Sequence, residues 1–307
     1  MNFLITGATG LLGSEIIEIK RSSIGLSSKD CNLSVSNHAF LTLEDEQVDA
    51  VIHCAAKVGG VKANTDYVAD FFDDNVKMNM NVLEACRAKK LKLVSVLSTC
   101  IYPDASYVTY PLTEEQLHLG PPHSSNFGYA YAKRMLEVQS RAYRQQFGCN
   151  FITVIPNNLY GLNDNYDLNS GHVIPSLIRK FHEAILAEKD EVVVWGTGKS
   201  VREFTFARDA AKIILWLAEN YDGEKPVNIG NPEQVSIESL VLAISGEMRY
   251  KGSISFDNTM PDGQFKKPSS NQFLRSIGWK GEYTSLLVGL KETIKSFKDR
   301  YPNVRGV

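Results

Sequence analysis

The sequence predicts an α/β fold built on a doubly wound parallel sheet, with a smaller α/β lobe toward the C-terminus. Short, β-branched apolar segments alternate with longer segments of helical periodicity through the first half of the chain. A glycine-rich turn joins the first apolar segment to the first amphipathic one. Strands that alternate with helices pair in parallel and carry helices on both faces, so this order predicts a single main sheet.

The expected strands of the main sheet are brief and are flanked by turn or polar residues. They cover residues 2–6, 50–56, 93–99 and 151–156. Between them, apolar residues recur at helical spacing over residues 10–20, 70–90 and 129–147. Gly148 follows the last of these segments in the position of a C-cap glycine.

The pattern loosens after Pro156, where residues 157–171 are rich in Asn, Asp and Gly and predict a long functional loop. The remaining chain predicts helices over 174–188, 208–220, 236–248 and 284–301, with strands at 191–196 and 252–256. We expect a first domain of residues 1–165 plus about 203–232, and a smaller lobe of about 166–202 and 233–307.

Composition excludes several classes of protein. The 307 residues carry a formal net charge of −2, which gives no bulk attraction to nucleic acid or to an anionic membrane. The five cysteines are widely spaced and lack a Cys-x-x-Cys pair, so we expect reduced thiols and no metal site. The N-terminus lacks the features of a signal peptide and no apolar run is long enough to span a membrane, which predicts a cytoplasmic protein.

The glycine turn at Gly7, Gly10 and Gly13 follows the first strand directly and opens the first helix. Glycine permits the tight turn and close approach to a pyrophosphate, while the helix N-terminus offers free N–H groups. This context predicts a Rossmann-type dinucleotide site, with an ordinary glycine-rich turn as the alternative.

Residues 26–30 determine the cofactor that we expect. An acidic residue about 20 positions after the turn normally binds the ribose of NAD, but this segment reads Leu-Ser-Ser-Lys-Asp. The hydroxyl of Ser28 and the ammonium group of Lys29 suit a 2′-phosphate and favour NADP(H). The alternative is that Lys29 is simply solvated and that Asp30 binds a ribose.

Three residues predict reduction of a carbonyl group. Tyr129 and Lys133 are four positions apart on one helix face, so the lysine is expected to lower the tyrosine pKa and prepare a proton donor. Ser98 ends a parallel strand, where ligands bind in such sheets, and can hydrogen-bond the same carbonyl oxygen.

Longer motifs extend this pattern over nearly the whole chain. They are HCAAKVGG (53–60), STCIYP (98–103), GPPHSSNFGYAYAKR (120–134), IPNNLYG (155–161), GHVIPSLI (171–178), VVWGTG (193–198) and DGQFKK (262–267). The set resembles the extended short-chain dehydrogenase/reductase family and, within it, the GDP-L-fucose synthase family. The dipeptide Leu162-Asn163 departs from that family, which usually has proline and histidine there.

The resemblance implies epimerisation of GDP-4-keto-6-deoxy-D-mannose at C3 and C5, followed by reduction at C4 with NADPH. It assigns the acid–base pair to Cys100 and His172. On spacing alone, Cys100 is more often an inert buried thiol and His172 a lone histidine. Their chemistry fits the role, since a thiolate can remove a proton and a histidine can return one near neutral pH.

The resemblance also implies the remaining contacts. The expected cofactor-binding residues are Gly7, Thr9, Gly10, Leu11, Leu12, Gly13, Ser28, Lys29, Ala55, Ala56, Val96, Leu97, Lys133, Pro156, Asn158, Leu159 and His172. The expected substrate-binding residues are Asn158, Lys180, Trp195, Arg202, Asp262 and Lys266. A homodimer is expected through two helices per subunit, with Met78 and Asn79 at the cofactor-side wall and the dimer face.

Two other functions stay open. Another nucleotide-sugar enzyme of this architecture, such as a 4-epimerase or a 4,6-dehydratase, would not need the Cys100/His172 pair. A dehydratase would also need an acidic pair beside the strand-end hydroxyl, where this chain has Thr99-Cys100-Ile101. A dinucleotide sensor without catalysis is the third possibility, and the intact set of reactive side chains argues against it.

Overall fold

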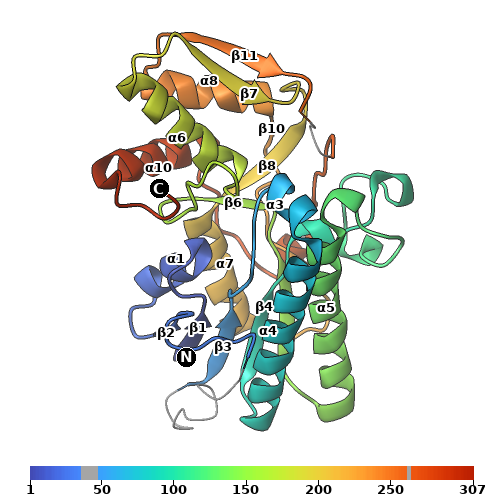
Figure 1. The fold of residues 1–307 in the computed structure, drawn as a ribbon. Coiled ribbons are helices and arrows are strands. Elements are labelled where there is room, and N and C mark those ends of the chain that lie inside the picture. The colour runs from blue at the N-terminus through green and yellow to red at the C-terminus, as the bar shows by residue number, and fades with distance from the viewer. Residues whose placement is uncertain (36–47, 261–263) are drawn as a thin grey trace.

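The computed structural model describes residues 1–35, 48–260 and 264–307, and its largest sheet has six strands (Figure 1). The strand order is β2–β1–β3–β4–β5–β9, and every neighbouring pair is parallel. The doubly wound parallel sheet is therefore confirmed. Its strands are β1 (Phe3–Thr6), β2 (Ile24–Leu26), β3 (Ala50–His53), β4 (Lys92–Val96), β5 (Phe151–Ile155) and β9 (Val227–Asn228).

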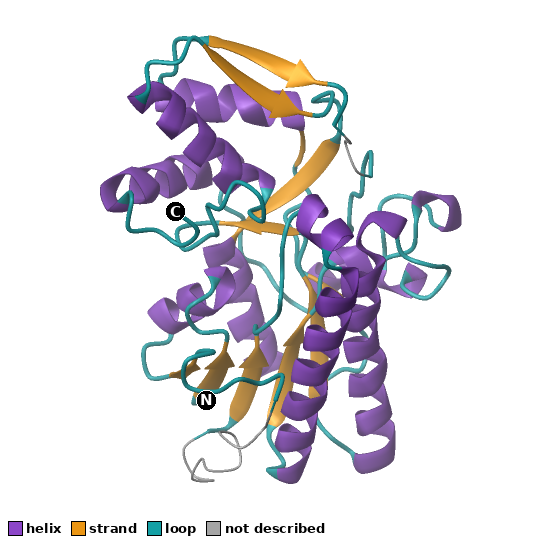
Figure 2. Cartoon of the chain, viewed as in Figure 1, coloured by secondary structure: helices purple, strands orange, loops and turns teal. Residues whose placement is uncertain are grey.

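Helices cover both faces of this sheet (Figure 2). Alternate strand residues face opposite sides, so Ile5 packs in one cluster with Ile16 and Ile214, whereas Leu4 packs in another with Leu136. The strands are short and apolar on both faces because both are buried, as expected of a parallel sheet. The covering helices are α1 (Leu11–Ile19) and α7 (Ala207–Asn220) on one face, and α4 (Val68–Ala88) and α5 (Phe127–Phe147) on the other.

A smaller lobe lies beyond the carboxyl ends of the strands and has its own apolar core (Figure 1). It contains a three-stranded sheet, β10–β8–β6, and a two-stranded sheet, β11–β7. Its strands are β6 (Asn158–Tyr160), β7 (Glu191–Trp195), β8 (Val201–Phe206), β10 (Gln234–Ser236) and β11 (Ser253–Asp257). Its helices are α6 (Val173–Leu186), α8 (Ile237–Met248) and α10 (Leu286–Arg300).

Shorter elements connect the two parts. Helix α9 (Gln272–Ser276) and the residues that follow it return to the central sheet. Leu274 of the helix belongs to the core of that sheet, and Trp279 packs against it. The short helices are α3 (Val61–Asp66), α9 (Gln272–Ser276) and the 3-10 turns η1 (Thr99–Ile101), η2 (Ala105–Tyr107), η3 (Glu114–Gln116) and η4 (Ser124–Asn126). Among the described residues, no helix combines the length and apolarity needed to cross a membrane.

The predicted long elements agree with the structure to within a few residues at each end. Gly148 has a φ of +68° and accepts the left-handed conformation at the end of α5, which confirms the predicted C-cap. The predicted loop over residues 157–171 is wrong in its first part, because Asn158–Tyr160 form β6. This strand pairs in parallel with β8, and three residues are too few for a readable periodicity.

Candidate active site

A cavity of about 1040 Å³ lies between the carboxyl ends of the central strands and the smaller lobe. This is the position at which open α/β sheets bind their ligands. Residues from both parts of the chain line it, including all five predicted catalytic residues: Ser98, Cys100, Tyr129, Lys133 and His172. The cavity is large enough for a dinucleotide and part of a second ligand.

The glycine turn forms the floor of the cavity beneath α1. Gly7 has a φ of +65°, and a Cβ atom there would lie 2.9 Å from the Cα of Ala55. A Cβ atom on Gly13 would lie 2.3 Å from the carbonyl oxygen of Gly7. Both positions therefore require glycine, and the predicted sequence of strand, turn and helix is confirmed. The predicted cofactor residues that line the cavity here are Gly7, Thr9, Gly10, Leu11, Leu12 and Gly13.

The turn after β2 forms another part of the wall. Ser27 and Ser28 line the cavity, whereas Lys29 is exposed and lies outside its lining. The Oδ2 atom of Asp30 accepts hydrogen bonds from the backbone N–H of Ser27 at 2.8 Å and from its hydroxyl at 2.6 Å. These bonds lower the pKa of Asp30. This carboxylate therefore stabilises its own turn.

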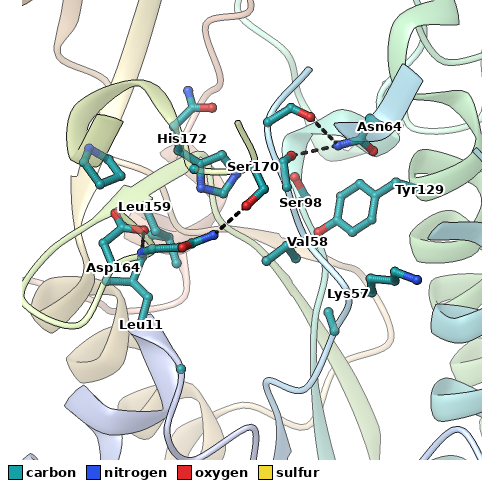
Figure 3. Close-up of a pocket in the computed structure, with 18 of the residues that line it drawn as sticks. Leu11, Lys57, Val58, Asn64, Ser98, Tyr129, Leu159, Asp164, Ser170 and His172 are labelled. Carbon is teal, nitrogen blue, oxygen red and sulfur yellow. Dashed lines mark hydrogen bonds between the residues drawn. The ribbon is translucent and has the colours of Figure 1, made fainter. Parts of the chain in front are cut away.

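Ser98 and Tyr129 face the same space from opposite elements (Figure 3). Ser98 follows β4 and caps η1, where its Oγ accepts a hydrogen bond from the backbone N–H of Cys100 at 3.3 Å. Tyr129 lies in the first turn of α5. The two hydroxyl groups hydrogen-bond each other. They are therefore placed to hold one carbonyl oxygen between them.

The expectation that the pKa of Tyr129 is lowered is wrong for this structure. Burial raises the pKa of the phenol, the neighbouring Cys100 raises it further, and the hydrogen bond with Ser98 opposes this only in part. Lys133 instead donates a hydrogen bond of 2.9 Å to the carbonyl oxygen of Val96. Burial lowers the pKa of Lys133 to about 8. Tyr129 is therefore a neutral phenol at neutral pH and carries a proton that it can donate.

A buried polar network supports this region, and sequence analysis did not predict it. His53 Nδ1 lies 2.8 Å from Thr6 Oγ1, and its Nε2 lies 3.2 Å from Asn79 Oδ1. Asn79 in turn donates to the carbonyl oxygen of Ala132 at 3.2 Å and so connects β3 with α5. Asn79 is fully buried, so its predicted place at the dimer face is wrong, whereas Met78 does line the cavity.

Cys100 has a cationic neighbour that sequence analysis missed. Lys267 Nζ donates to the Sγ atom of Cys100 at 3.7 Å and lines the cavity. The Lys267 ammonium group therefore places a positive charge beside the sulfur atom. The predicted residue, Lys266, lies outside the cavity lining and places its Nζ over the ring of Tyr110. The two lysines are adjacent, so only the path of the backbone could tell which one enters the cavity.

His172 lies across the cavity from Ser98 and Tyr129 (Figure 3). It is the N-cap residue of α6, so the start of that helix fixes its position. Burial lowers the pKa of the imidazole, and the positive charge of Arg305 lowers it further. Neither the chain spacing nor the composition related His172 to Cys100, because they lie on different lobes.

The far end of the cavity carries positive charge and an aromatic face. Lys180, Trp195 and Arg202 all line it, and Lys180 Nζ lies 5.7 Å from the centre of the Trp195 ring. Burial lowers the pKa of Lys180. Asn158 also lines the cavity and donates through Nδ2 to the carbonyl oxygen of Glu203 at 2.8 Å. Asp262 lies outside the described residues.

The remaining predicted cofactor residues follow the carboxyl ends of the central strands. All of them line the same cavity: Ala55, Ala56, Val96, Leu97, Pro156 and Leu159. The predicted set is thus brought together except for Lys29 and Lys266, which lie outside the lining, and Asp262. Asp164 and Arg305 also line the cavity and were not predicted.

Comparison with known proteins identifies the family. The model of the NAD dependent epimerase/dehydratase family matches residues 3–230. A GDP-L-fucose synthase of Dictyostelium discoideum is 40% identical over 98% of this chain and 97% of its own, and that of Escherichia coli is 33% identical over 98% of both. The crystal structure of a GDP-L-fucose synthetase from Naegleria fowleri bound to NADP has a TM-score of 0.89 at 38% identity, covering 99% of this chain and 94% of that one. The chain therefore belongs to the NAD dependent epimerase/dehydratase family and, within it, to the GDP-L-fucose synthase family.

Proposed function

We propose that this protein converts GDP-4-keto-6-deoxy-D-mannose into GDP-L-fucose, by epimerisation at C3 and C5 and reduction at C4. The observation that carries the proposal is the single cavity in which Ser98 and Tyr129 face His172, with Cys100 directly beside Ser98. The glycine turn opens into the same cavity and suits NADP(H), which supplies the hydride when bound. The sequence identity to GDP-L-fucose synthases supports this substrate.

In the epimerisation, Cys100 and His172 exchange protons with the sugar. The protons at C3 and C5 are acidic because each neighbours the C4 ketone. Cys100, with Lys267 beside its sulfur, takes a proton and leaves an enolate on the sugar. Ser98 and Tyr129 hydrogen-bond the enolate oxygen. The imidazolium form of His172 then returns a proton to the opposite face, since His172 lies on the other side of the cavity, and its lowered pKa makes that form a stronger acid.

In the reduction, Tyr129 donates a proton to the C4 oxygen, and bound NADPH would supply the hydride for the carbon. Ser98 positions that oxygen, and Lys133 anchors the start of α5 to the end of β4 through the carbonyl oxygen of Val96. A neutral phenol is the protonation state that this step requires. The new hydroxyl group keeps the proton, and the phenolate that remains is reprotonated from the cavity.

The GDP group fits the smaller lobe. Lys180 and Arg202 supply positive charge for the diphosphate, and Trp195 offers a face for the nucleotide. Asn158 contacts the sugar, and we assign Lys266 to the periphery of the same site. We assign NADP(H) to the part built on the central sheet and the GDP-sugar to the smaller lobe. The boundaries expected at 165, 203 and 233 shift, because Tyr160, Phe204 and Phe206 pack in the core of the smaller lobe and Leu274 packs in that of the central sheet.

The direct test is incubation of the purified protein with GDP-4-keto-6-deoxy-D-mannose and NADPH. We expect absorbance at the NADPH band to fall in step with formation of GDP-L-fucose, identified by mass and by NMR. A 4-epimerase or a 4,6-dehydratase returns its hydride to the sugar and consumes no NADPH. Binding of both ligands without NADPH consumption would therefore refute the proposal. A sugar that also stays unchanged would indicate a dinucleotide sensor without catalysis.

Lys29→Ala is expected to weaken NADPH binding about tenfold and to leave NADH binding nearly unchanged. The physical reason is the loss of one positive charge beside Ser28, where the 2′-phosphate would lie. Dissociation constants of both cofactors, measured by fluorescence at fixed ionic strength, test this. Lys291→Ala removes an equally exposed lysine from α10 and serves as the control. An unchanged preference would remove Lys29 from the cofactor site.

We also propose a cytoplasmic homodimer. The outward faces of α4 and α5 expose large apolar side chains, among them Met80, Tyr131 and Val138. Exposed apolar residues at helical spacing on two adjacent helices suit packing against the same pair in a second subunit. The five cysteines are free thiols, which supports a reducing compartment. Light scattering of the purified protein would measure the oligomeric state.

A further inference from the structure

The segment from Gly161 to Asp164 crosses the first turn of α1, beside the glycine turn. Asn163 Nδ2 donates to Ser14 Oγ at 2.9 Å. A Cβ atom on Gly161 would lie 3.4 Å from Leu11 Cδ1, so Gly161 packs beside the Leu11 side chain. Asp164 consequently lies near Leu11 and Leu159 at the cavity wall (Figure 3). In the proposed function, this helix N-terminus binds the pyrophosphate of NADP(H).

The carboxyl group of Asp164 is buried with one oxygen unused. Only 3% of the residue is exposed, and Oδ1 accepts a hydrogen bond from the backbone N–H of Asn165 at 2.8 Å. Within the described ranges, Oδ2 has no hydrogen-bond partner although it is buried. A buried polar atom without a partner is unfavourable, and at a cavity wall a bound ligand can supply the missing hydrogen bond.

The C-terminal tail holds this segment in place. Tyr166 donates its backbone N–H to the carbonyl oxygen of Arg305 at 2.9 Å, and Arg300 Nη1 donates to Asn163 Oδ1 at 2.7 Å. The Arg305 side chain itself lines the cavity. The carboxyl group is therefore held at the cavity wall before any ligand binds, which reduces the entropy lost on binding.

The charge state of Asp164 follows from its surroundings. Burial raises its pKa to about 7, although the Asn165 N–H and the Arg305 charge both lower it. Of the other groups that face this region, Tyr166 is a buried phenol and His172 has a lowered pKa, so both are neutral near pH 7. Glu15 of α1 is paired with Arg208. Arg305 is thus the neighbouring charge that acts on Asp164.

We propose that Asp164 is a further cofactor-binding residue, which acts as a neutral carboxylic acid and donates a hydrogen bond from Oδ2 to a pyrophosphate oxygen of NADP(H). A carboxylate would repel the phosphates at this position, whereas the acid form supplies a donor and satisfies its own unpaired oxygen. Arg305 adds positive charge at the same wall. This inference rests on the proposed function only in taking NADP(H) as the cofactor.

The proposal predicts a specific pH dependence of cofactor binding. Binding raises the pKa of Asp164, because the bound state needs the proton, so affinity is full at low pH and falls as pH rises through 7. For the wild-type protein with NADH, which lacks the titrating 2′-phosphate, we expect the dissociation constant to rise about 30-fold between pH 6 and pH 8.5. Calorimetry at pH 7 in two buffers of different ionisation enthalpy should show uptake of about half a proton per NADH.

Asp164→Asn keeps a donor at every pH and cannot titrate. We expect this variant to bind NADH at pH 8.5 about as tightly as the wild type binds it at pH 6, without the proton uptake. Asp167→Asn is the matched control, because it makes the same substitution in the same loop outside the cavity lining. That variant should keep the wild-type pH profile.

Two results would overturn the inference. One is a wild-type protein that binds NADH without taking up a proton, which needs no variant and is independent of folding defects. The other is an Asp164→Asn variant that folds, as thermal unfolding would show, and retains the wild-type pH profile. Turnover of the keto sugar is measured separately, so failure of the proposed reaction and failure of this cofactor contact give different results.

Discussion

Tyr129→Phe is expected to slow reduction of the 4-keto sugar by about 10²–10⁴-fold, which is the usual contribution of a positioned general acid. The variant keeps the ring but removes the hydroxyl group that bonds with Ser98. The C4 oxygen then loses both a hydrogen bond and its proton donor as negative charge develops. NADPH binding should change little, because the glycine turn is untouched.

Single-turnover absorbance measurements of NADPH oxidation test this expectation for Tyr129. Tyr107→Phe is the matched control, since the Tyr107 side chain is exposed and lies outside the cavity lining, and it should retain full activity. Solvent deuterium exchange at C3 and C5 should also slow in Tyr129→Phe, because the same hydroxyl stabilises the enolate. A variant that reduces the sugar at the wild-type rate would remove Tyr129 from the reaction.

Cys100→Ser is expected to slow exchange of solvent deuterium into C3 and C5 by about 10²–10⁴-fold, while reduction of a suitable 4-ketone continues. A serine hydroxyl has nearly the same shape, but it does not ionise near neutral pH and cannot serve as the base. The Lys267 ammonium group would then face a neutral oxygen at the position of the sulfur, which lies 3.7 Å from its Nζ in the structure. Ser98 and Tyr129, which act in reduction, remain.

Two measurements separate the roles of Cys100. Mass spectrometry follows deuterium incorporation into the sugar, and NADPH absorbance follows reduction. Cys149→Ser, which changes a thiol outside the cavity lining, should behave like the wild type in both. Equal loss of exchange and reduction in Cys100→Ser would argue against a role in epimerisation.

The central sheet could be predicted because its signals are local. The four- and five-residue strands of this sheet are apolar and buried on both faces, and each long helix repeats its apolar residues at helical spacing. The glycine turn is equally local, since Gly7 and Gly13 contact residues of the same strand–turn–helix unit and of the adjacent strand end. Strands of two or three residues, such as β6 and β9, carry too little pattern to be found.

The side chains that face the ligands were harder to predict, because adjacent residues in the chain point in opposite directions. Lys266 and Lys267 are chemically equivalent in the sequence, yet only Lys267 enters the cavity. Lys29 is a good candidate for a phosphate contact by position, but it lies outside the lining while Ser28 lies within it. Which side of the chain faces a ligand depends on backbone direction, and that is set by packing with distant segments.

By itself, the sequence determined the order of strands and helices, the glycine turn, the reactive residue types and the resemblance to a family. Tertiary structure decided the protonation states and the partners of those residues. Burial raises the pKa of Tyr129 where a lysine four positions away had predicted a lowered pKa, and the C-terminal tail brings Arg305 beside Asp164 and His172. Both effects depend on the dielectric surroundings and on contacts between segments far apart in the chain, which no local pattern of residues contains.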